Sequence, residues 1–110
     1  MGSPTTRPVT EREIRSALRS LGNTPNQVAR ALDILGCRGS SDCEFCPVAM
    51  FLERVFGDRI RTLQINSTDA IVGAAHYTLF LRLSKVMRQF VVLFDTTTRY
   101  ENLRIPQGAA

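Results

Sequence analysis

Apolar residues recur every three or four positions in three stretches of the first half of the chain, which is the spacing of an amphipathic helix. Each stretch begins at a residue that can cap a helix and ends at a glycine. These signals predict helices over residues 10–22, 24–36 and 46–57. The apolar stripes are Ile14, Ala17, Leu18 and Leu21 in the first helix, Val28, Ala31, Leu32 and Leu35 in the second, and Val48, Phe51, Leu52 and Val55 in the third.

Two of the predicted helix starts repeat one pattern. Thr10 and Thr24 are followed three residues later by Glu13 and Gln27, whose side chains can close a capping box. Only residues 22–23 separate the two helices, which predicts a tight corner between them.

After the third helix the period changes from helical to alternating, which is typical of strands. We predict strands over residues 61–65, 70–73 and 77–83, the last being either a separate strand or a bulged extension of the second. Ser84 then caps a final helix that ends at residues 95–98. The broad apolar face of this helix consists of Val86, Met87, Phe90, Val91, Leu93 and Phe94.

The order of these elements predicts an α+β fold: three N-terminal helices, a small antiparallel sheet of two or three strands, and one C-terminal helix packed on the sheet. With 110 residues, 44% of them hydrophobic, the chain has the size of a single domain. We place this compact domain at residues 10–103, between a disordered N-terminus at residues 1–9 and a flexible tail at residues 104–110. Tyr100 and Leu103 are expected to hold the end of the chain against the domain.

The charge and the cysteine content set bounds on partners and location. The net charge of +4 is spread along the chain, so it permits binding of nucleic acid or an acidic partner without requiring it. The apolar runs are too short to span a bilayer, and we expect no membrane partner. An odd number of cysteines, three, with no signal peptide before them predicts a cytoplasmic protein.

The three cysteines are the most distinctive residues of the first half. Cys46 stands at the predicted N-cap of the third helix and Pro47 at its first position, so we interpret this pair as structural. The alternative is a zinc-stabilised domain in which Cys37, Cys43, Cys46 and His76 are the ligands. Structural zinc sites usually contain two close ligand pairs, and only Cys43 and Cys46 form one, so we expect no metal and no cofactor.

A second interpretation of the same pair is redox chemistry, because Cys43 and Cys46 form a C-x-x-C motif at a helix start. Redox proteins place this motif directly after a strand, whereas here a helix and a loop precede it. The sequence shows no paired carboxylates in helical register, no phosphate-binding glycine loop and no nucleophile elbow. We therefore expect a protein that is not an enzyme.

Nucleic-acid binding is an alternative function. The first two helices could form a helix-turn-helix, in which Asn26, Gln27 and Arg30 on the outer face of helix 24–35 would contact DNA. A strand pair after three helices also resembles a winged helix, although ten residues precede the third helix where that fold has a short turn. The other explanation is an ordinary helical corner with solvated polar residues.

The function we favour is a non-catalytic regulatory or protein-interaction module that binds an unidentified protein partner or itself. The last helix has more apolar residues than one small sheet can cover, and leftover apolar surface often marks an interface. We therefore expect a homodimer that uses Phe80 of the third strand and Val92 of the last helix. The alternative is that the first or third helix covers this surface within a monomer.

One further pattern links the two halves. Residues 46–52 read CPVAMFL, residues 86–95 read VMRQFVVLFD, and residues 100–103 read YENL. Over residues 30–103 the chain resembles a group of small actinobacterial and actinophage proteins with a Cys-Pro-hydrophobic-Ala-x-aromatic-Leu motif and a C-terminal Phe-Val-x-x-Phe-Asp helix. The resemblance implies a compact cytoplasmic fold and singles out Cys46 and Pro47, but it implies no activity. After Asp95 the group has a Gly turn, where this chain has Thr96–Arg99 instead.

Overall fold

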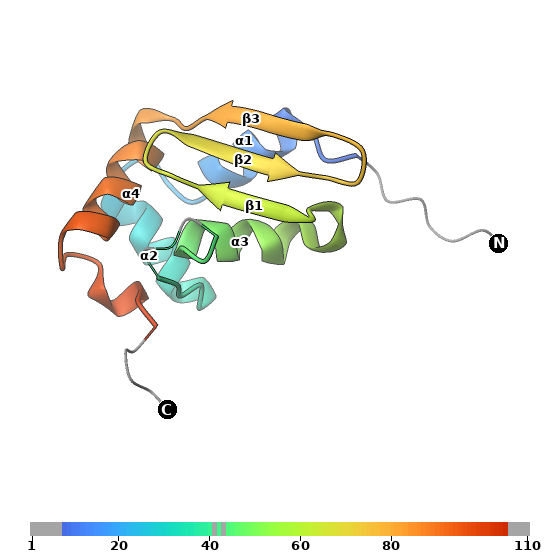
Figure 1. Cartoon of the computed structure of the whole chain (residues 1–110). Coiled ribbons are helices and arrows are strands. Elements are labelled where there is room, and N and C mark those ends of the chain that lie inside the picture. Colours follow the sequence, from blue (N-terminus) through green and yellow to red (C-terminus); the bar gives the residue numbers. More distant parts are fainter. Residues whose placement is uncertain (1–7, 41, 43, 106–110) are drawn as a thin grey trace.

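The structure is a computed structural model that describes residues 8–40, 42 and 44–105. Within these residues four α-helices and a three-stranded antiparallel sheet confirm the predicted α+β class, with three helices before the sheet and one after it (Figure 1). The elements in chain order are α1 Glu11–Arg19, α2 Pro25–Leu35, α3 Pro47–Phe56, the 3-10 turn η1 Gly57–Arg59, β1 Thr62–Ile65, β2 Asp69–Gly73, β3 Thr78–Arg82, α4 Lys85–Thr96 and the 3-10 turn η2 Glu101–Leu103.

All four helices begin where their caps were predicted. The capping side chain accepts a hydrogen bond from a first-turn N–H in each case, which satisfies a donor that the helix itself leaves free. The four caps are Thr10, Thr24, Cys46 and Ser84. Gly36 and Gly57 end α2 and α3 with positive φ angles of 72° and 54°, as the glycine positions predicted.

The corner between α1 and α2 is longer than predicted. Because α1 ends at Arg19, the connection contains residues 20–24 rather than only residues 22–23. Leu21 is buried although it lies outside the helix. Its apolar side chain fits the helical spacing, which is why the sequence predicted a helix that is too long. The side chain of Gln27 accepts from the N–H of Asn23, one residue before the cap, and not from the cap itself.

The three strands pair in the order β1-β2-β3, so the third strand is a separate strand and not an extension of the second. The register places Gln64, Ile71 and Phe80 in one row across the sheet. Asn66 organises the β1–β2 turn, because its Oδ1 accepts hydrogen bonds from the N–H groups of Thr68 and Asp69.

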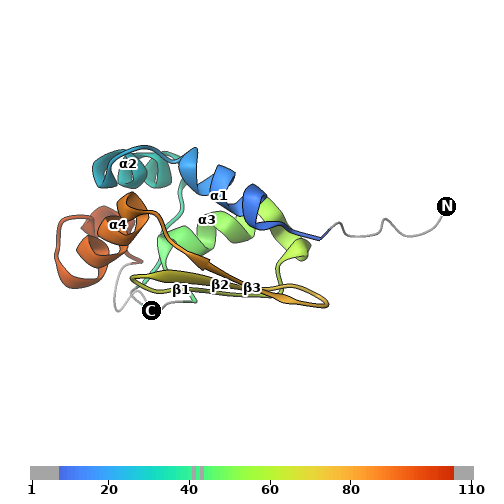
Figure 2. The same ribbon diagram turned by 90° about the horizontal axis from the view of Figure 1, so that it is seen from above.

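The helices lie on one side of the sheet and leave its other face open (Figure 2). Leu63, Val72 and Leu81 point from the strands into the core on the helix side. α4 contacts chiefly α2 rather than the sheet, which corrects the predicted packing of the last helix. Its apolar face was wide because it meets α2 and the final turn, and Met87, Phe90, Val91 and Phe94 are buried there.

Ordered contacts extend beyond both predicted ends of the domain. Val9 is buried, and its carbonyl accepts a 2.6 Å hydrogen bond from the Tyr77 hydroxyl. At the other end, Arg104 forms a parallel bridge with Gly39, whose N–H and carbonyl bond to Leu103 and Ile105. A Cβ at residue 39 would lie 2.0 Å from the carbonyl oxygen of Phe45, so only glycine fits between the backbone of residues 45–47 and the returning chain. Residues 1–7 and 106–110, predicted disordered and flexible, lie outside the described residues.

Candidate functional site

Cys46 occupies the structural position that the sequence indicated. Its side chain is buried, and its Sγ accepts from the backbone N–H of Ala49 at 3.4 Å. Pro47 follows at the first helical position, where its missing N–H costs nothing. The thiol thus completes the start of α3 and faces the core rather than a surface.

The alternative zinc ligands are not brought together where the structure describes them. Cys37 and Cys46 are buried, whereas His76 is exposed in the turn between β2 and β3. The β2–β3 turn lies toward the C-terminal end of α3 (Figure 1), whereas Cys46 caps the N-terminal end of the same helix. The 10 residues of α3 make it about 15 Å long at 1.5 Å per residue. No group of three metal-ligating side chains occurs within residues 8–40, 42 and 44–105; Cys43 lies outside them.

Cys37 is also poorly suited to nucleophilic chemistry. Burial raises the pKa of its thiol, and the charge of Arg54 opposes this effect only in part. A thiol with a raised pKa stays protonated, and the thiolate is the reactive form. The C-x-x-C interpretation includes Cys43, which lies outside the described residues.

The three residues predicted to contact DNA have different environments on α2. The Oδ1 of Asn26 accepts a 2.7 Å hydrogen bond from the hydroxyl of Tyr100, so this side chain ties α2 to the end of the chain. The side chain of Gln27 bonds to the N–H of Asn23 at 2.7 Å. Arg30 is exposed. Two of the three side chains therefore support the fold directly.

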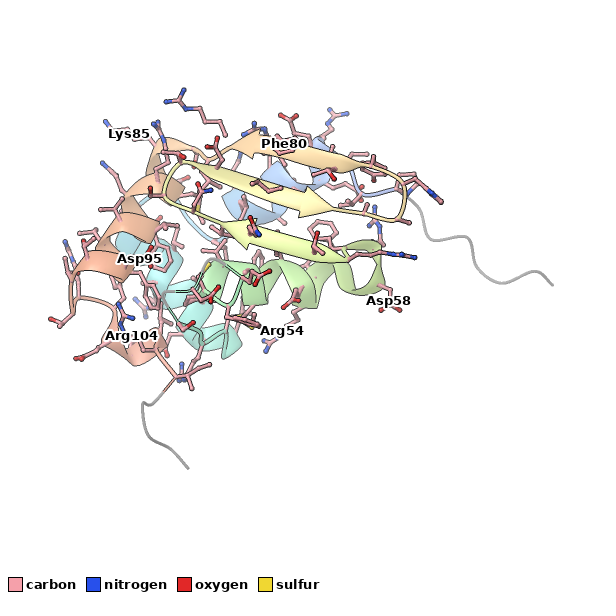
Figure 3. All side chains as sticks on the ribbon, in the orientation of Figure 1. Arg54, Asp58, Phe80, Lys85, Asp95 and Arg104 are labelled. Carbon is pink, nitrogen blue, oxygen red and sulfur yellow. The ribbon has the colours of Figure 1, made fainter. Side chains whose placement is uncertain are left out.

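Phe80 lies on the open face of the sheet, on the edge strand β3 (Figure 3). It is 74% exposed, while its neighbours Leu79 and Leu81 point toward the helices. Beside it on the same face is Ile71 of β2, its partner in the register. An aromatic side chain of this size with so little cover is the most exposed apolar feature of the sheet.

Along the outer edge of β3, the backbone groups of Thr78 and Phe80 have no partner among the residues that the structure describes. The carbonyl of Tyr77 and the N–H of Leu83 bond toward β2, through Ala74 and Thr68. Because the direction alternates along a strand, the backbone groups of Thr78, Phe80 and Arg82 point away from β2. Arg15 donates to the carbonyl of Arg82 at 3.0 Å, which covers one end of this edge.

Val92 lies on a different surface from Phe80, contrary to the single interface that the sequence predicted. It is 43% exposed on α4 and lines a groove between α4 and the start of α2. No strand residue lines this groove. The prediction joined the two residues because both were surplus apolar positions, but α4 turns away from the sheet toward α2.

Comparison with known proteins adds no relative to this picture: no family model matches the chain, and no curated protein and no solved structure is significantly similar to it. The resemblance to small actinobacterial and actinophage proteins stays a prediction. Within the described residues, no helix is both long enough and apolar enough to cross a membrane.

Sequence reasoning missed the basic character of the groove beside Val92. Lys85, Arg88, Gln89 and Val92 are spaced i, i+3, i+4 and i+7, so the sequence did contain the signal that they share one face of α4. The apolar residues between them dominated the pattern. The sequence predicted that the last helix ends at residues 95–98, but it did not indicate that the following turn brings Arg99 to this face.

Proposed function

We propose that this protein is a small, non-catalytic interaction module that binds a second copy of itself through the edge of β3. The observation that carries the proposal is the position of Phe80. It combines an exposed aromatic ring with outward-pointing backbone groups on an edge that no other strand of the described residues pairs with. Folded proteins usually protect such edges, because an edge strand pairs readily with another strand.

The edge is self-complementary about Phe80. A two-fold axis at this residue aligns β3 antiparallel to its copy, with Phe80 facing Phe80 and Thr78 facing Arg82. The backbone groups of Thr78 and Phe80 then have partners, and the sheet grows from three strands to six. The carbonyl of Arg82 already accepts from Arg15, so it must share or exchange this hydrogen bond at each end of the new pair. The two Arg82 side chains stand at opposite ends of the new pair, so like charges do not face each other.

The side chains favour the same arrangement. The two Phe80 rings become cross-strand neighbours on the open face of the sheet, with Ile71 beside each of them. Burying an exposed phenylalanine contributes about 2 kcal/mol, and aromatic pairs add about 1 kcal/mol. Because the strand is only five residues long, we expect a weak and reversible dimer with a dissociation constant on the order of 10 µM.

The first test is the oligomeric state across a concentration series, by sedimentation velocity. The wild-type chain should change from monomer to dimer as its concentration passes through the micromolar range. Phe80→Glu should stay monomeric, because two carboxylates would then face each other across the axis. The matched control is Gln64→Glu, which adds the same charge to the same open face on the other edge strand and should dimerise like wild type.

A second variant separates edge pairing from simple contact between exposed rings. Thr78→Pro removes an outward-pointing N–H from β3 but leaves Phe80 in place, and proline is tolerated on an edge strand. It should weaken dimerisation about tenfold or more while circular dichroism stays unchanged. A wild-type chain that remains monomeric at every concentration would overturn the proposal, as would a dimer that Phe80→Glu and Thr78→Pro leave intact.

A further inference from the structure

A groove of about 690 Å³ lies between the first turn of α2 and one face of α4. We name it the α2–α4 groove and define it by residues 24–26 of α2, by Lys85, Arg88 and Val92 of α4, and by Arg99 from the turn that follows. Its volume is in the range typical of small-molecule sites. It is separate from the β3 edge described above.

The charges around this groove have one sign. Lys85, Arg88 and Arg99 line it, and no aspartate or glutamate does. None of the ion pairs within the described part of the chain involves these three side chains. Three cations that share a concave surface without a counter-charge create a positive potential, and this potential attracts an anion.

Arg88 also has an unused donor. Its Nε atom is buried and has no hydrogen-bond partner among the described residues. Buried polar groups in proteins almost always have a partner, so an exception needs an explanation. A guanidinium group binds oxyanions through paired, parallel N–H donors, and Arg88 stands between Lys85 and Val92 on the groove face of α4. Because Nε is buried, its N–H reaches an anion in the groove only when the side chain turns outward.

The helix termini strengthen the positive potential. The first turn of α2 lies at the groove, and Lys85 is the first residue of α4. The N-terminus of a helix has partial positive charge, so anions are favoured there and cations are disfavoured. The cations at the start of α4 therefore lower the stability of the ligand-free protein, and a bound anion would offset this loss by neutralising their charge.

We propose that the α2–α4 groove binds a small organic phosphate. The phosphate group is held by Arg88, Lys85 and Arg99. A phosphate carries up to two negative charges and three oxygen acceptors, so it can bind two guanidinium groups and one ammonium group at once, whereas a carboxylate has one charge and two oxygens. The organic part lies on the apolar side of the groove, against Pro25, Val92 and Leu93. The wall of the groove at Tyr100 is rigid, since the Tyr100 ring stacks on Phe90 with ring centroids 5.2 Å apart and its hydroxyl bonds to Asn26.

The test compares two probes that differ by one phosphate. Adenosine 5′-monophosphate should bind at low salt, as measured by calorimetry, and should shift the backbone NMR signals of residues 24–26 and 85–92. Adenosine should not bind, and inorganic phosphate should bind more weakly at the same signals. Raising the salt concentration should weaken the binding of the nucleotide, because the interaction is mainly electrostatic.

Three variants locate the site. Arg88→Met should lower the affinity for adenosine 5′-monophosphate about tenfold or more, because a bidentate contact is lost. Lys85→Met, an exposed change that leaves the buried side of α4 intact, should lower the affinity by a smaller factor. Arg30→Met is the matched control, since Arg30 is an exposed arginine of α2 outside the groove, and it should bind like wild type.

Several outcomes would overturn this proposal. One is the absence of binding by both phosphate and the nucleotide. Another is equal binding of adenosine and its monophosphate, which would remove the role of the phosphate. Tight binding of a single-stranded oligonucleotide without binding of the mononucleotide would assign the cations to a nucleic-acid surface instead. None of these results bears on the β3 dimer, which is tested separately.

Discussion

The α2–α4 groove and a groove along α1 both carry several charged side chains, and the charges differ in sign and in pairing. The α2–α4 groove has three cations and no anion in its lining. A second groove of about 910 Å³ runs along α1 toward the end of α3, and we name it the α1 groove. Its charged lining residues have both signs: Glu11, Arg12, Glu13, Arg15 and Arg19.

In the α1 groove both glutamates are paired within the fold. Glu11 and Arg15 form an ion pair at 2.7 Å, and Glu13 pairs with Arg59 of η1 at the same distance. Arg15 also donates to the carbonyl of Arg82, which joins α1 to the sheet. Charges that are paired within the chain stabilise its own structure, whereas the unpaired cations of the α2–α4 groove are available to an external anion.

The largest expected difference between the two grooves is the stability that is lost when a residue of the groove wall is truncated to alanine. Tyr100 is 6% exposed, stacks on Phe90 and bonds to Asn26. Tyr100→Ala should therefore lower the free energy of unfolding by about 3 kcal/mol, because it leaves a cavity and removes a hydrogen bond. Val55, in the wall of the α1 groove, is 49% exposed. Val55→Ala should change stability by less than about 0.5 kcal/mol.

Denaturation with urea measures both values. Tyr100→Phe is the matched control for the ring, because it removes only the hydroxyl and should cost about 1 kcal/mol. If Tyr100→Ala and Val55→Ala had equal effects, the wall of the α2–α4 groove would not be the rigid structure that the contacts indicate.

The next difference is the sign of the change in stability when one arginine of each groove is replaced. Arg88→Met should raise the stability of the ligand-free protein by about 0.5 kcal/mol, since it removes a cation from the start of α4 and an unsatisfied buried donor. Arg15→Met should lower it by about 0.5 kcal/mol, since it breaks the pair with Glu11 and the bond to Arg82. Thermal unfolding at low salt checks both. Equal signs for the two substitutions would remove the contrast between the grooves.

The local parts of this fold were predictable from sequence. Each N-cap is decided by residues within one turn, so Thr10, Thr24, Cys46 and Ser84 could be recognised without any knowledge of the tertiary structure. The alternating strands were also correct in place, because one buried face imposes period two. The sequence left open whether there are two strands or three, and the pairing of β2 with β3 decides for three.

The parts that escaped prediction depend on contacts between distant segments. Gly39 looks like an ordinary loop residue until Arg104 and its neighbours return beside it. The apolar face of α4 was assigned to the sheet because the sequence does not say which element a helix will meet. The α2–α4 groove joins residues 24–26 to residues 85–100, so its single-sign charge appears only once α2 and α4 lie side by side.

The smallest expected effect concerns the dependence of stability on pH. The hydrogen bond from Arg59 is the main reason why the pKa of Glu13 lies below its ordinary value of 4.5, and bonds at Thr10 lower it further while burial opposes them. A carboxyl group with a lower pKa in the folded state stabilises the fold when it is ionised. Its contribution is complete above pH 4.5 and is lost as the pH falls through the pKa of the folded state.

Melting temperatures of wild type and Glu13→Gln, measured from neutral pH into the acid range, test this sign. Wild type should melt higher at neutral pH, and the gap should close as the pH falls below 4.5. When Arg59→Met is introduced into both proteins, the difference between their melting temperatures at neutral pH should also close, because the cation that lowers the pKa of Glu13 is gone. The lining of the α2–α4 groove has no carboxylate to titrate there, so the shift caused by Arg88→Met should stay constant over this range. A gap for Glu13→Gln that widened in acid would show that Glu13 is held in its protonated form, and the charges of the α1 groove would then not be paired as described.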